Sequence, residues 1–193
     1  MIKLEKDIRA CRECAARFLK TKTAHIPRPV TQLSTKARVL IAGQAPGARV
    51  YESGRFFTDP SGDRLREWLG VSEAQFYAKD NFSILPMAFC FPGYSQKGAD
   101  LPPPKICAKL WREKALTAMP QISCLILVGG YAQAWHLGKM SLTERVEKWR
   151  EIAPAVYPLP HPSWRNNAWL KKHPWFEEEL LPHMRQTISK LIP

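Results

Sequence analysis

The chain has 193 residues, 45% of them hydrophobic and 24% charged, and its net charge is +12 at pH 7. This length is most simply one domain with a sizeable core, and no stretch approaches the roughly 20 apolar residues that cross a membrane. The positive balance is compatible with a merely basic enzyme, but it favours a polyanionic partner, nucleic acid first and an anionic membrane second.

The first segment, residues 1–18, mixes charged side chains with short apolar steps and carries Cys11 and Cys14. Because it lacks the continuous apolar core of a signal peptide, we expect a cytoplasmic protein. A reducing compartment disfavours structural disulfides, so this close cysteine pair suggests metal binding or redox chemistry. We also expect a monomer with no membrane partner, since no stretch shows an obvious apolar stripe for self-association.

Four short apolar runs predict buried strands at residues 37–43, 82–89, 124–130 and 155–160. Helical patterns occupy residues 61–70, 105–119, 131–138, 142–152 and 175–192, and Pro182 should kink or interrupt the last of them. Continuous hydrophobicity is typical of parallel strands that are covered on both faces. We therefore predict a layered α/β domain with a mostly parallel, four-stranded sheet, whose ligand would bind at the carboxyl ends of the strands.

The first predicted strand runs into the turn GQAPG, in which Gln44 and Ala45 lie between two glycines and a proline. Gly43 and Gly47 allow a tight turn and a close approach to a ligand, while Pro46 stiffens the backbone. The turn lacks the lysine of a phosphate-binding loop and the spacing of a dinucleotide fingerprint, so by itself it is a weak signal.

Two phenylalanines follow on the same loop. We expect one of Phe56 and Phe57 to pack beneath the loop, because exposed aromatic rings are costly unless they stack on something. Beyond them, Asp59 or Ser61 should cap the N-terminus of the next helix.

The other cysteines are spread along the chain. Cys90 ends the second predicted strand, and Cys107 follows a long loop rich in proline and glycine. With the N-terminal pair they make a set of four, which by count fits zinc or a [4Fe–4S] cluster equally well. Alternatively, Cys90 and Cys107 are ordinary buried cysteines and the close pair is accidental. Cys124 lies within an apolar run and should be a small buried hydrophobe.

The fourth predicted strand ends in the sequence HPS, where Pro160 and Pro162 bracket His161 and restrict the backbone. A neutral histidine held in this way can donate a hydrogen bond to a developing negative charge. A lone histidine is more often structural than catalytic. Because His161 lies at a strand end, before a basic aromatic segment, a catalytic role is a stronger hypothesis for it than for an average histidine.

Basic and aromatic side chains follow this turn. Arg165, Lys171 and Lys172 can contact phosphates, while Trp164 or Trp169 can stack on bases or wedge between them. The segment is therefore a candidate nucleic-acid contact.

Taken together, these motifs resemble those of the uracil-DNA glycosylase superfamily, and most closely those of its iron–sulfur branches, families 4 and 5. The resemblance rests on the N-terminal cysteine pair, GQAPG, GRFFTDPSGDRL, the pair Cys90 and Cys107, and HPS. It spans nearly the whole chain. The order and the separations of the motifs make it specific.

This resemblance implies one three-layer α/β/α domain over residues 1–193, with a central parallel sheet. It implies a [4Fe–4S] cluster in a mainly structural role, with zinc as the alternative, held by Cys11, Cys14, Cys90 and Cys107. It also implies a DNA partner, from which a damaged base is flipped into a pocket. Uracil is the first candidate for that base, and hypoxanthine and xanthine remain open.

The resemblance also implies roles for particular residues. Gln44 would orient water, Phe57 would stack on the base, and His161 would donate to the base oxygen that gains charge as the glycosidic bond breaks. Such a donor is worth roughly 3 kcal/mol. The rest of the pocket would be formed by Gly43, Ala45, Pro46 and Gly47. The DNA-contacting loop, which would enter the minor groove, would comprise Ser163, Trp164, Arg165, Asn166 and Lys171.

The GQAPG turn departs from the family pattern because it carries no carboxylate, whereas some relatives place an acid there. Gln44 can orient water but cannot act as a general base near neutral pH. Glu52, Asp59 or Asp63 can instead approach the sugar, although the two aspartates fit equally well as helix caps.

A second departure concerns base recognition. Many relatives bind uracil with an asparagine where this chain has Pro86, which offers neither a side-chain hydrogen bond nor a backbone N–H. Either backbone amides, Asn81 or another residue would then recognise uracil, or the substrate is a different base. These departures keep two further hypotheses open: a relative that binds DNA without cleaving it, and a metal-containing protein whose basic face binds RNA.

Overall fold

The computed structural model describes residues 1–193, apart from the side chain of Ile2. Its centre is a sheet of four short strands, β1 (Val39–Ala42), β2 (Phe82–Ile84), β3 (Cys124–Val128) and β4 (Val156–Leu159). The strands lie in the order β2-β1-β3-β4, and every neighbouring pair is parallel. The predicted α/β fold is confirmed, with a sheet that is parallel throughout rather than mostly so.

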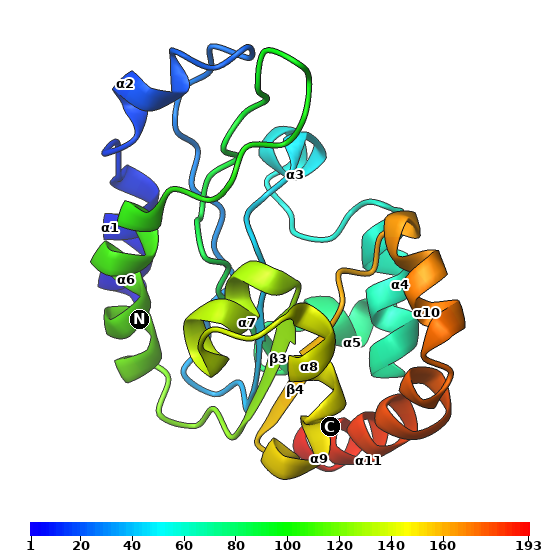
Figure 1. Ribbon diagram of the computed structural model, residues 1–193. Coiled ribbons are helices and arrows are strands. Elements are labelled where there is room, and N and C mark those ends of the chain that lie inside the picture. The colour runs from blue at the N-terminus through cyan, green and yellow to red at the C-terminus, as the bar shows by residue number, and fades with distance from the viewer.

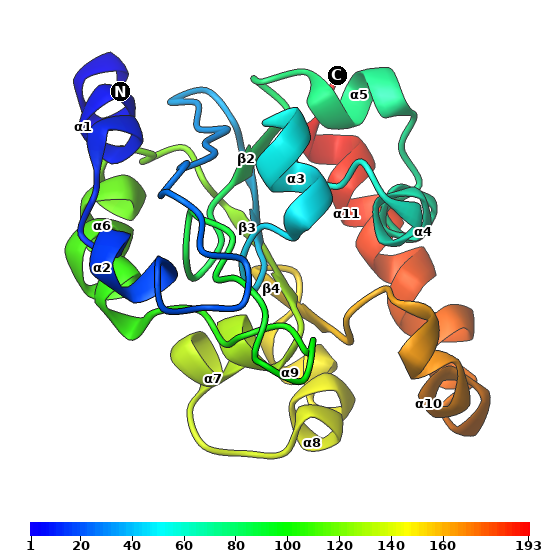
Figure 2. The same cartoon turned by 90° about the horizontal axis from the view of Figure 1, so that it is seen from above.

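Helices cover both faces of this sheet (Figures 1 and 2). One face is packed by α1 (Ile2–Ala10), α6 (Lys105–Thr117) and α7 (Gly130–Leu137). The other is packed by α4 (Pro60–Leu69), α5 (Glu73–Tyr77), α8 (Leu142–Glu147), α9 (Trp149–Ile152) and α11 (Leu181–Leu191). No helix of the described residues is long and apolar enough to cross a membrane.

The alternation of side chains along β1 explains the three layers. Val39 and Ile41 belong to the core beneath α4 and α11, whereas Leu40 and Ala42 pack on the opposite face. All four are fully buried. A strand that must bury both of its faces is apolar at every position, which is the pattern that predicted parallel strands.

The second strand is shorter than the predicted run of residues 82–89. Beyond Leu85, whose N–H donates to the carbonyl oxygen of Ile41 at 2.9 Å, the chain reaches Pro86. Proline has no N–H to continue the ladder, so the regular strand ends at Ile84.

The C-terminal part differs from the expected loop followed by one long helix. Residues beyond the HPS turn form a 3-10 turn, η1 (Trp164–Asn166), and a short helix, α10 (Asn167–Lys172). A π-helical turn, η2 (Phe176–Leu180), then precedes α11, and Pro182 lies in the first turn of α11. The interruption expected at Pro182 is thus a change of helix type. The short helices α2 (Ala15–Phe18) and α3 (Ala48–Ser53) were likewise not predicted.

A buried cation joins two helices on the α6 side of the sheet. Arg112 is only 2% exposed, and it donates to the carbonyl oxygen of Leu85 at 3.1 Å and to Nε2 of His136 at 3.2 Å. Burial lowers the pKa of Arg112 to about 10, so the guanidinium stays charged at pH 7. Burial and this neighbouring charge lower the pKa of His136 to about 4. His136 is therefore a neutral acceptor for Arg112.

The free energy of unfolding should fall as the pH drops from about 6.5 to about 4. Over this range His136 stays neutral in the folded protein but binds a proton in the unfolded chain, so added protons favour unfolding. In the variant His136→Gln, whose amide oxygen can still accept from Arg112, this dependence should be weaker. Urea unfolding of both proteins at pH 7 and pH 5 checks this. Equal losses on acidification in the two proteins would contradict it.

Candidate active site and cysteine pocket

A pocket opens at the carboxyl ends of all four strands. Its deep part is lined by Gly43, Gln44, Ala45, Phe56, Phe57, Ile84, Pro86, Val128 and His161. Its outer part shares several of these residues and adds Pro46, Gly47, Val50, Asp59, Ser61, Pro92, Asp100 and Leu101. The residues predicted to line the base pocket and to act in catalysis therefore lie together, at the edge of the sheet where α/β proteins bind their ligands.

The GQAPG turn is fastened to the segment that follows β2. The N–H groups of Met87 and Ala88 donate to the carbonyl oxygens of Gly43 and Gln44, at 2.9 and 3.2 Å. Gly47 then caps the N-terminus of α3 in an extended conformation. Both ends of the turn are thereby held, which fixes the direction in which its backbone faces the pocket.

Phe57 has a strained backbone, with φ of 54°, which a residue with a side chain rarely adopts. The hydroxyl of Tyr77 donates to the carbonyl oxygens of Phe56 and Phe57 at 2.8 and 3.0 Å, and Arg66 donates to Phe57 at 3.1 Å. A Cβ atom on Gly62 would lie only 1.9 Å from the carbonyl oxygen of Phe57. The backbone of Phe57 is thus held by two hydrogen-bond donors and by close contact with α4, which is possible only because residue 62 is glycine.

As expected, one phenylalanine of the pair packs beneath the loop. Phe56 is 5% exposed and belongs to the core, whereas the partly buried ring of Phe57 lines the pocket. Asp59 is the helix cap, and its Oδ1 accepts from the N–H of Gly62 at 3.1 Å and from the hydroxyl of Ser61 at 2.6 Å. The cap fixes the start of α4 directly after the strained residue.

His161 lies in the pocket wall directly after β4. The side-chain amide of Asn166 donates to its carbonyl oxygen at 2.7 Å, which holds the HPS turn against η1. Burial lowers the pKa of His161; the charges of Asp59 and Asp100 oppose this decrease, and that of Arg165 adds to it. The imidazole is accordingly neutral at pH 7, with one N–H to donate and one nitrogen to accept.

The predicted DNA-contacting residues lie on η1 and α10, beside the pocket. Trp164 is 73% exposed, and Arg165 and Lys171 are also exposed. Arg64 on α4 donates to the carbonyl oxygen of Ser163 at 3.3 Å and to Oδ1 of Asn167 at 2.8 Å. This arginine, which the sequence did not single out, ties the segment to the rest of the site.

Trp169 does not share this exposure. Its indole N–H donates to the hydroxyl of Thr143 at 2.9 Å, and its ring packs on Phe176 and Trp175. Of the two tryptophans considered for stacking on bases, Trp164 is largely exposed, whereas Trp169 is partly buried.

Of the carboxylates proposed to approach the sugar, Asp59 lines the pocket, whereas Glu52 and Asp63 are not among its lining residues. Asp63 instead forms an ion pair with Arg66. The second carboxylate at the pocket is Asp100, from the long loop between Cys90 and Cys107.

Asn81, considered as a substitute for the missing base reader, lies at the wrong end of β2. It precedes the strand, is 5% exposed, and its amide donates to the carbonyl oxygen of Gln75 at 3.0 Å. The pocket is instead formed at the opposite, carboxyl end, where Pro86 is part of its wall.

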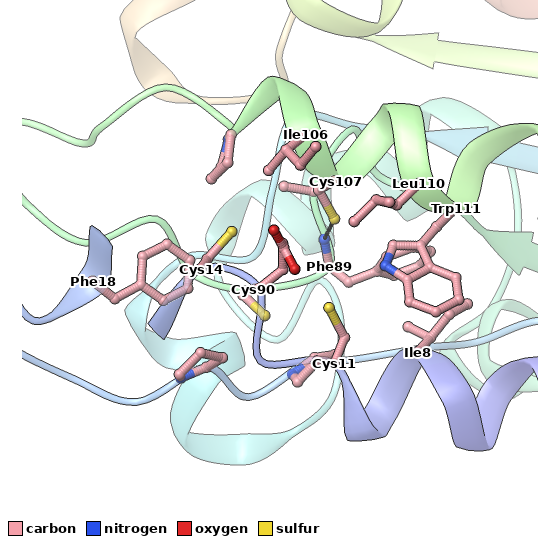
Figure 3. Close-up of a pocket in the computed structure, with 15 residues that line it drawn as sticks. Ile8, Cys11, Cys14, Phe18, Phe89, Cys90, Ile106, Cys107, Leu110 and Trp111 are labelled. Carbon is pink, nitrogen blue, oxygen red and sulfur yellow. Dashed lines mark hydrogen bonds between the residues drawn. The ribbon is translucent and has the colours of Figure 1, made fainter. Parts of the chain in front are cut away.

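The four predicted metal ligands line a second pocket, and Figure 3 shows their sulfur atoms facing the same space. Cys11 ends α1, Cys14 begins α2, Cys90 follows β2, and Cys107 lies in the first turn of α6. The N–H of Phe89 donates to Sγ of Cys107 at 3.4 Å. The rest of the lining is largely apolar.

The thiols of this pocket are partly withdrawn from water. Burial raises the pKa of Cys90 to about 12 and that of Cys107 to about 11, and repulsion from the neighbouring cysteines adds to both. A bound metal would have to displace these protons. Among the described residues, no three histidine, cysteine, aspartate or glutamate side chains lie close enough together to hold one metal ion. Cys124 lies buried in β3, away from this pocket, as expected.

The chain matches a known protein family. The family model described as the uracil DNA glycosylase superfamily matches residues 30–185. The match covers the strands, the pocket at their carboxyl ends, Cys90 and Cys107, but it begins beyond Cys11 and Cys14.

Replacing Tyr77 with phenylalanine should lower the free energy of unfolding by about 1–2 kcal/mol, because the carbonyl groups of Phe56 and Phe57 lose a donor. Burial raises the pKa of Tyr77, so the hydroxyl keeps the proton that it donates. Tyr131→Phe, on an exposed ring of α7, is the matched control and should change the value by less than about 0.5 kcal/mol. Urea denaturation measures both. Equal losses would show that the Tyr77 hydroxyl contributes nothing to holding the strained loop.

Proposed function

Because the chain belongs to the uracil DNA glycosylase superfamily, we propose that it hydrolyses the N-glycosidic bond of a deaminated base in DNA, uracil first among them. The observation that carries this proposal is the convergence of Gln44, Phe57 and His161 on one pocket at the carboxyl ends of the strands. A flipped base would enter this pocket, at a cost of a few kcal/mol for its removal from the stack.

The chemistry asks different things of the three side chains. Phe57, whose backbone is held from two sides, would stack on the base. His161 is half-buried and its imidazole is neutral at pH 7, so it can donate its one ring N–H to the oxygen of the leaving base. Gln44 would orient the attacking water through its amide oxygen.

The choice of base is expected to be loose. Apart from Gln44 and His161, the side chains of the deep pocket are apolar, and Pro86 offers no donor. A pocket discriminates among polar bases when its own buried polar groups lose their hydrogen-bond partners on binding the wrong base. We therefore propose uracil only because the chain belongs to this family, and we propose hypoxanthine and xanthine as further substrates of the same pocket.

The exposed segment η1–α10 would grip the DNA. Arg165 and Lys171 are placed to contact phosphates, and Trp164 is the exposed ring nearest in sequence to His161. Ser163 and Asn166 would act mainly by positioning, since the carbonyl of Ser163 and the amide of Asn166 are engaged with Arg64 and His161.

We further propose that Cys11, Cys14, Cys90 and Cys107 hold a [4Fe–4S] cluster. The support is the donor set, four thiols on one largely apolar pocket with a backbone N–H directed at one sulfur. Zinc, which four sulfurs would bind at about 2.3 Å, is the alternative metal for the same four residues. When bound, the cluster would tie the N-terminal segment to the long loop.

A second candidate function is DNA binding without cleavage. It is favoured by the absence of a carboxylate in the GQAPG turn and by Pro86 in the pocket wall. The two functions differ in one product, because only the enzyme generates abasic sites.

His161→Ala should slow base removal by about 100- to 1,000-fold, the effect of deleting one donor to a developing anion. Anaerobically purified protein would be incubated with single- and double-stranded oligonucleotides that each carry one uracil, hypoxanthine or xanthine. Alkali-labile breaks report the reaction. Breaks that are lost in the variant support the glycosylase and name its base. Tight binding without breaks at any base would establish the binding-only alternative.

Cys107→Ser should lower the iron and inorganic sulfide content well below the expected value of about four per chain, and should lower the melting temperature. Cys124→Ala, which removes a buried thiol outside the pocket, is the matched control and should retain both. Metal analysis of anaerobically purified proteins, with visible absorbance, decides the point. One zinc ion per chain in the wild-type protein would show that the four cysteines bind zinc and would refute the cluster.

A further inference from the structure

The pocket contains no acid in its glycine turn, yet two carboxylates reach its outer wall. Asp59 and Asp100 both line the space that Gln44 and His161 share. Both also raise the pKa of His161 by their charge, so each acts electrostatically at this site. The question is which of the two faces the sugar as an available base.

Asp59 already has a structural task. Its Oδ1 accepts from the N–H of Gly62 and from the hydroxyl of Ser61, and these bonds begin α4. Moving the Asp59 carboxylate would break both bonds and release the first turn of the helix. Asp59 therefore suits a structural role better than that of a base that must approach the attacking water.

Asp100 has no such task among the described residues. It is exposed, it enters none of their ion pairs, and it lies at the pocket beside Pro92 and Leu101. A free carboxylate at the mouth of a pocket that holds a neutral histidine is a natural partner for water and for a positively charged sugar.

The backbone around Asp100 is held firmly although its side chain is free. Asp100 bridges Tyr94 in an antiparallel pair, and the N–H of Leu101 donates to the carbonyl oxygen of Gly93 at 3.0 Å. The N–H of Lys22 donates to the carbonyl oxygen of Tyr94 at 3.1 Å, which fastens this loop to the N-terminal segment. A base on a fixed backbone loses little freedom when substrate binds.

We propose that Asp100 supplies the catalytic carboxylate that the GQAPG turn lacks. This inference rests on the proposed function and names the residue that completes its site. As the C1′–N bond breaks, its electron pair stays on the base, which becomes an anion, and the sugar becomes an oxocarbenium-like cation. A water oxygen then bonds to C1′ while Asp100 accepts the water's proton. Asp100 returns this proton to solvent, and the base anion takes up one proton, so the overall reaction consumes one water.

Gln44 and Asp100 together would then perform the two roles that a single carboxylate in the turn performs in some relatives. The amide oxygen of Gln44 can orient the water but cannot remove its proton, whereas the Asp100 carboxylate can do both. The proposed cluster, held in part by Cys90 and Cys107 on either side of the long loop, would anchor the segment that carries this carboxylate.

The test compares single-turnover base removal in Asp100→Asn, Asp59→Asn and Glu52→Gln. Asp100→Asn should be slowed about 100-fold or more. Asp59→Asn keeps a residue that caps helices well, and it should lose less than tenfold. Glu52→Gln, an exposed change on α3 outside the pocket, controls for the loss of one charge. A larger loss in Asp59→Asn than in Asp100→Asn would overturn the assignment.

A second variant separates chemistry from a structural role. If Asp100 provides the missing acid, Gln44→Glu introduced into Asp100→Asn should recover at least tenfold of the lost rate, because it places a carboxylate on the other side of the same pocket. If the Asp100 carboxylate were needed only for the shape of the long loop, a glutamate at position 44 would not restore the rate. No recovery, with both proteins folded by circular dichroism, would count against Asp100.

Binding to sugar analogues tests Asp100 even if no base is removed. Oligonucleotides that carry a cationic pyrrolidine in place of the sugar should bind the wild type at least tenfold more tightly than ones with a neutral tetrahydrofuran, and Asp100→Asn should lose this preference. A wild type that removes no base but keeps an Asp100-dependent preference would refute the proposed hydrolysis and retain the electrostatic role of Asp100. An unchanged preference in the variant would refute the role of Asp100 alone.

Discussion

Two backbone hydrogen bonds, from Met87 to Gly43 and from Ala88 to Gln44, join the parts of this molecule that carry its chemistry. They fasten the turn after β1 to the chain after β2. The same stretch places Pro86 in the wall of the candidate active site and Cys90 in the cysteine pocket. Residues 86–90 thus connect the two pockets, since Pro86 lines one and Ala88 to Cys90 line the other.

The charges around the active pocket are arranged by depth. The neutral imidazole of His161 reaches the deep part, where a leaving base would place negative charge, while Asp59 and Asp100 line only the outer part, where a sugar would carry positive charge. Arg165 and Lys171 lie on the exposed segment beside the pocket. A nucleotide entering base first would meet a group suited to each of its parts. This ordering explains how a chain with a strongly positive balance can still present carboxylates to a polyanionic substrate.

Much of the sheet was predictable because its strands are buried on both faces, and burial leaves an unbroken apolar run in the sequence. The GQAPG turn, Phe57 and His161 were found because glycine, proline and histidine at strand ends are local signals. Arg64 and Tyr77 gave no such signal, because each acts on a carbonyl group far away in the chain.

The errors have physical causes of their own. Asn81 precedes β2, and a residue before a parallel strand lies at the edge of the sheet opposite to the pocket. The segment around Trp169, which the sequence predicts as a loop, is the helix α10 in the structure. Burial of the Trp169 ring against Phe176 stabilises a helix that local composition does not favour.

The contact between Gly62 and the carbonyl of Phe57 has a consequence for how mutational surveys of this protein would be interpreted. No side chain larger than hydrogen fits between them, so a saturation library would reject every replacement of Gly62 as strictly as those of a catalytic group. Gly62 would nevertheless never touch DNA. Intolerance at this position would record a shortage of space, and ranking residues by their tolerance alone would assign it to the chemistry.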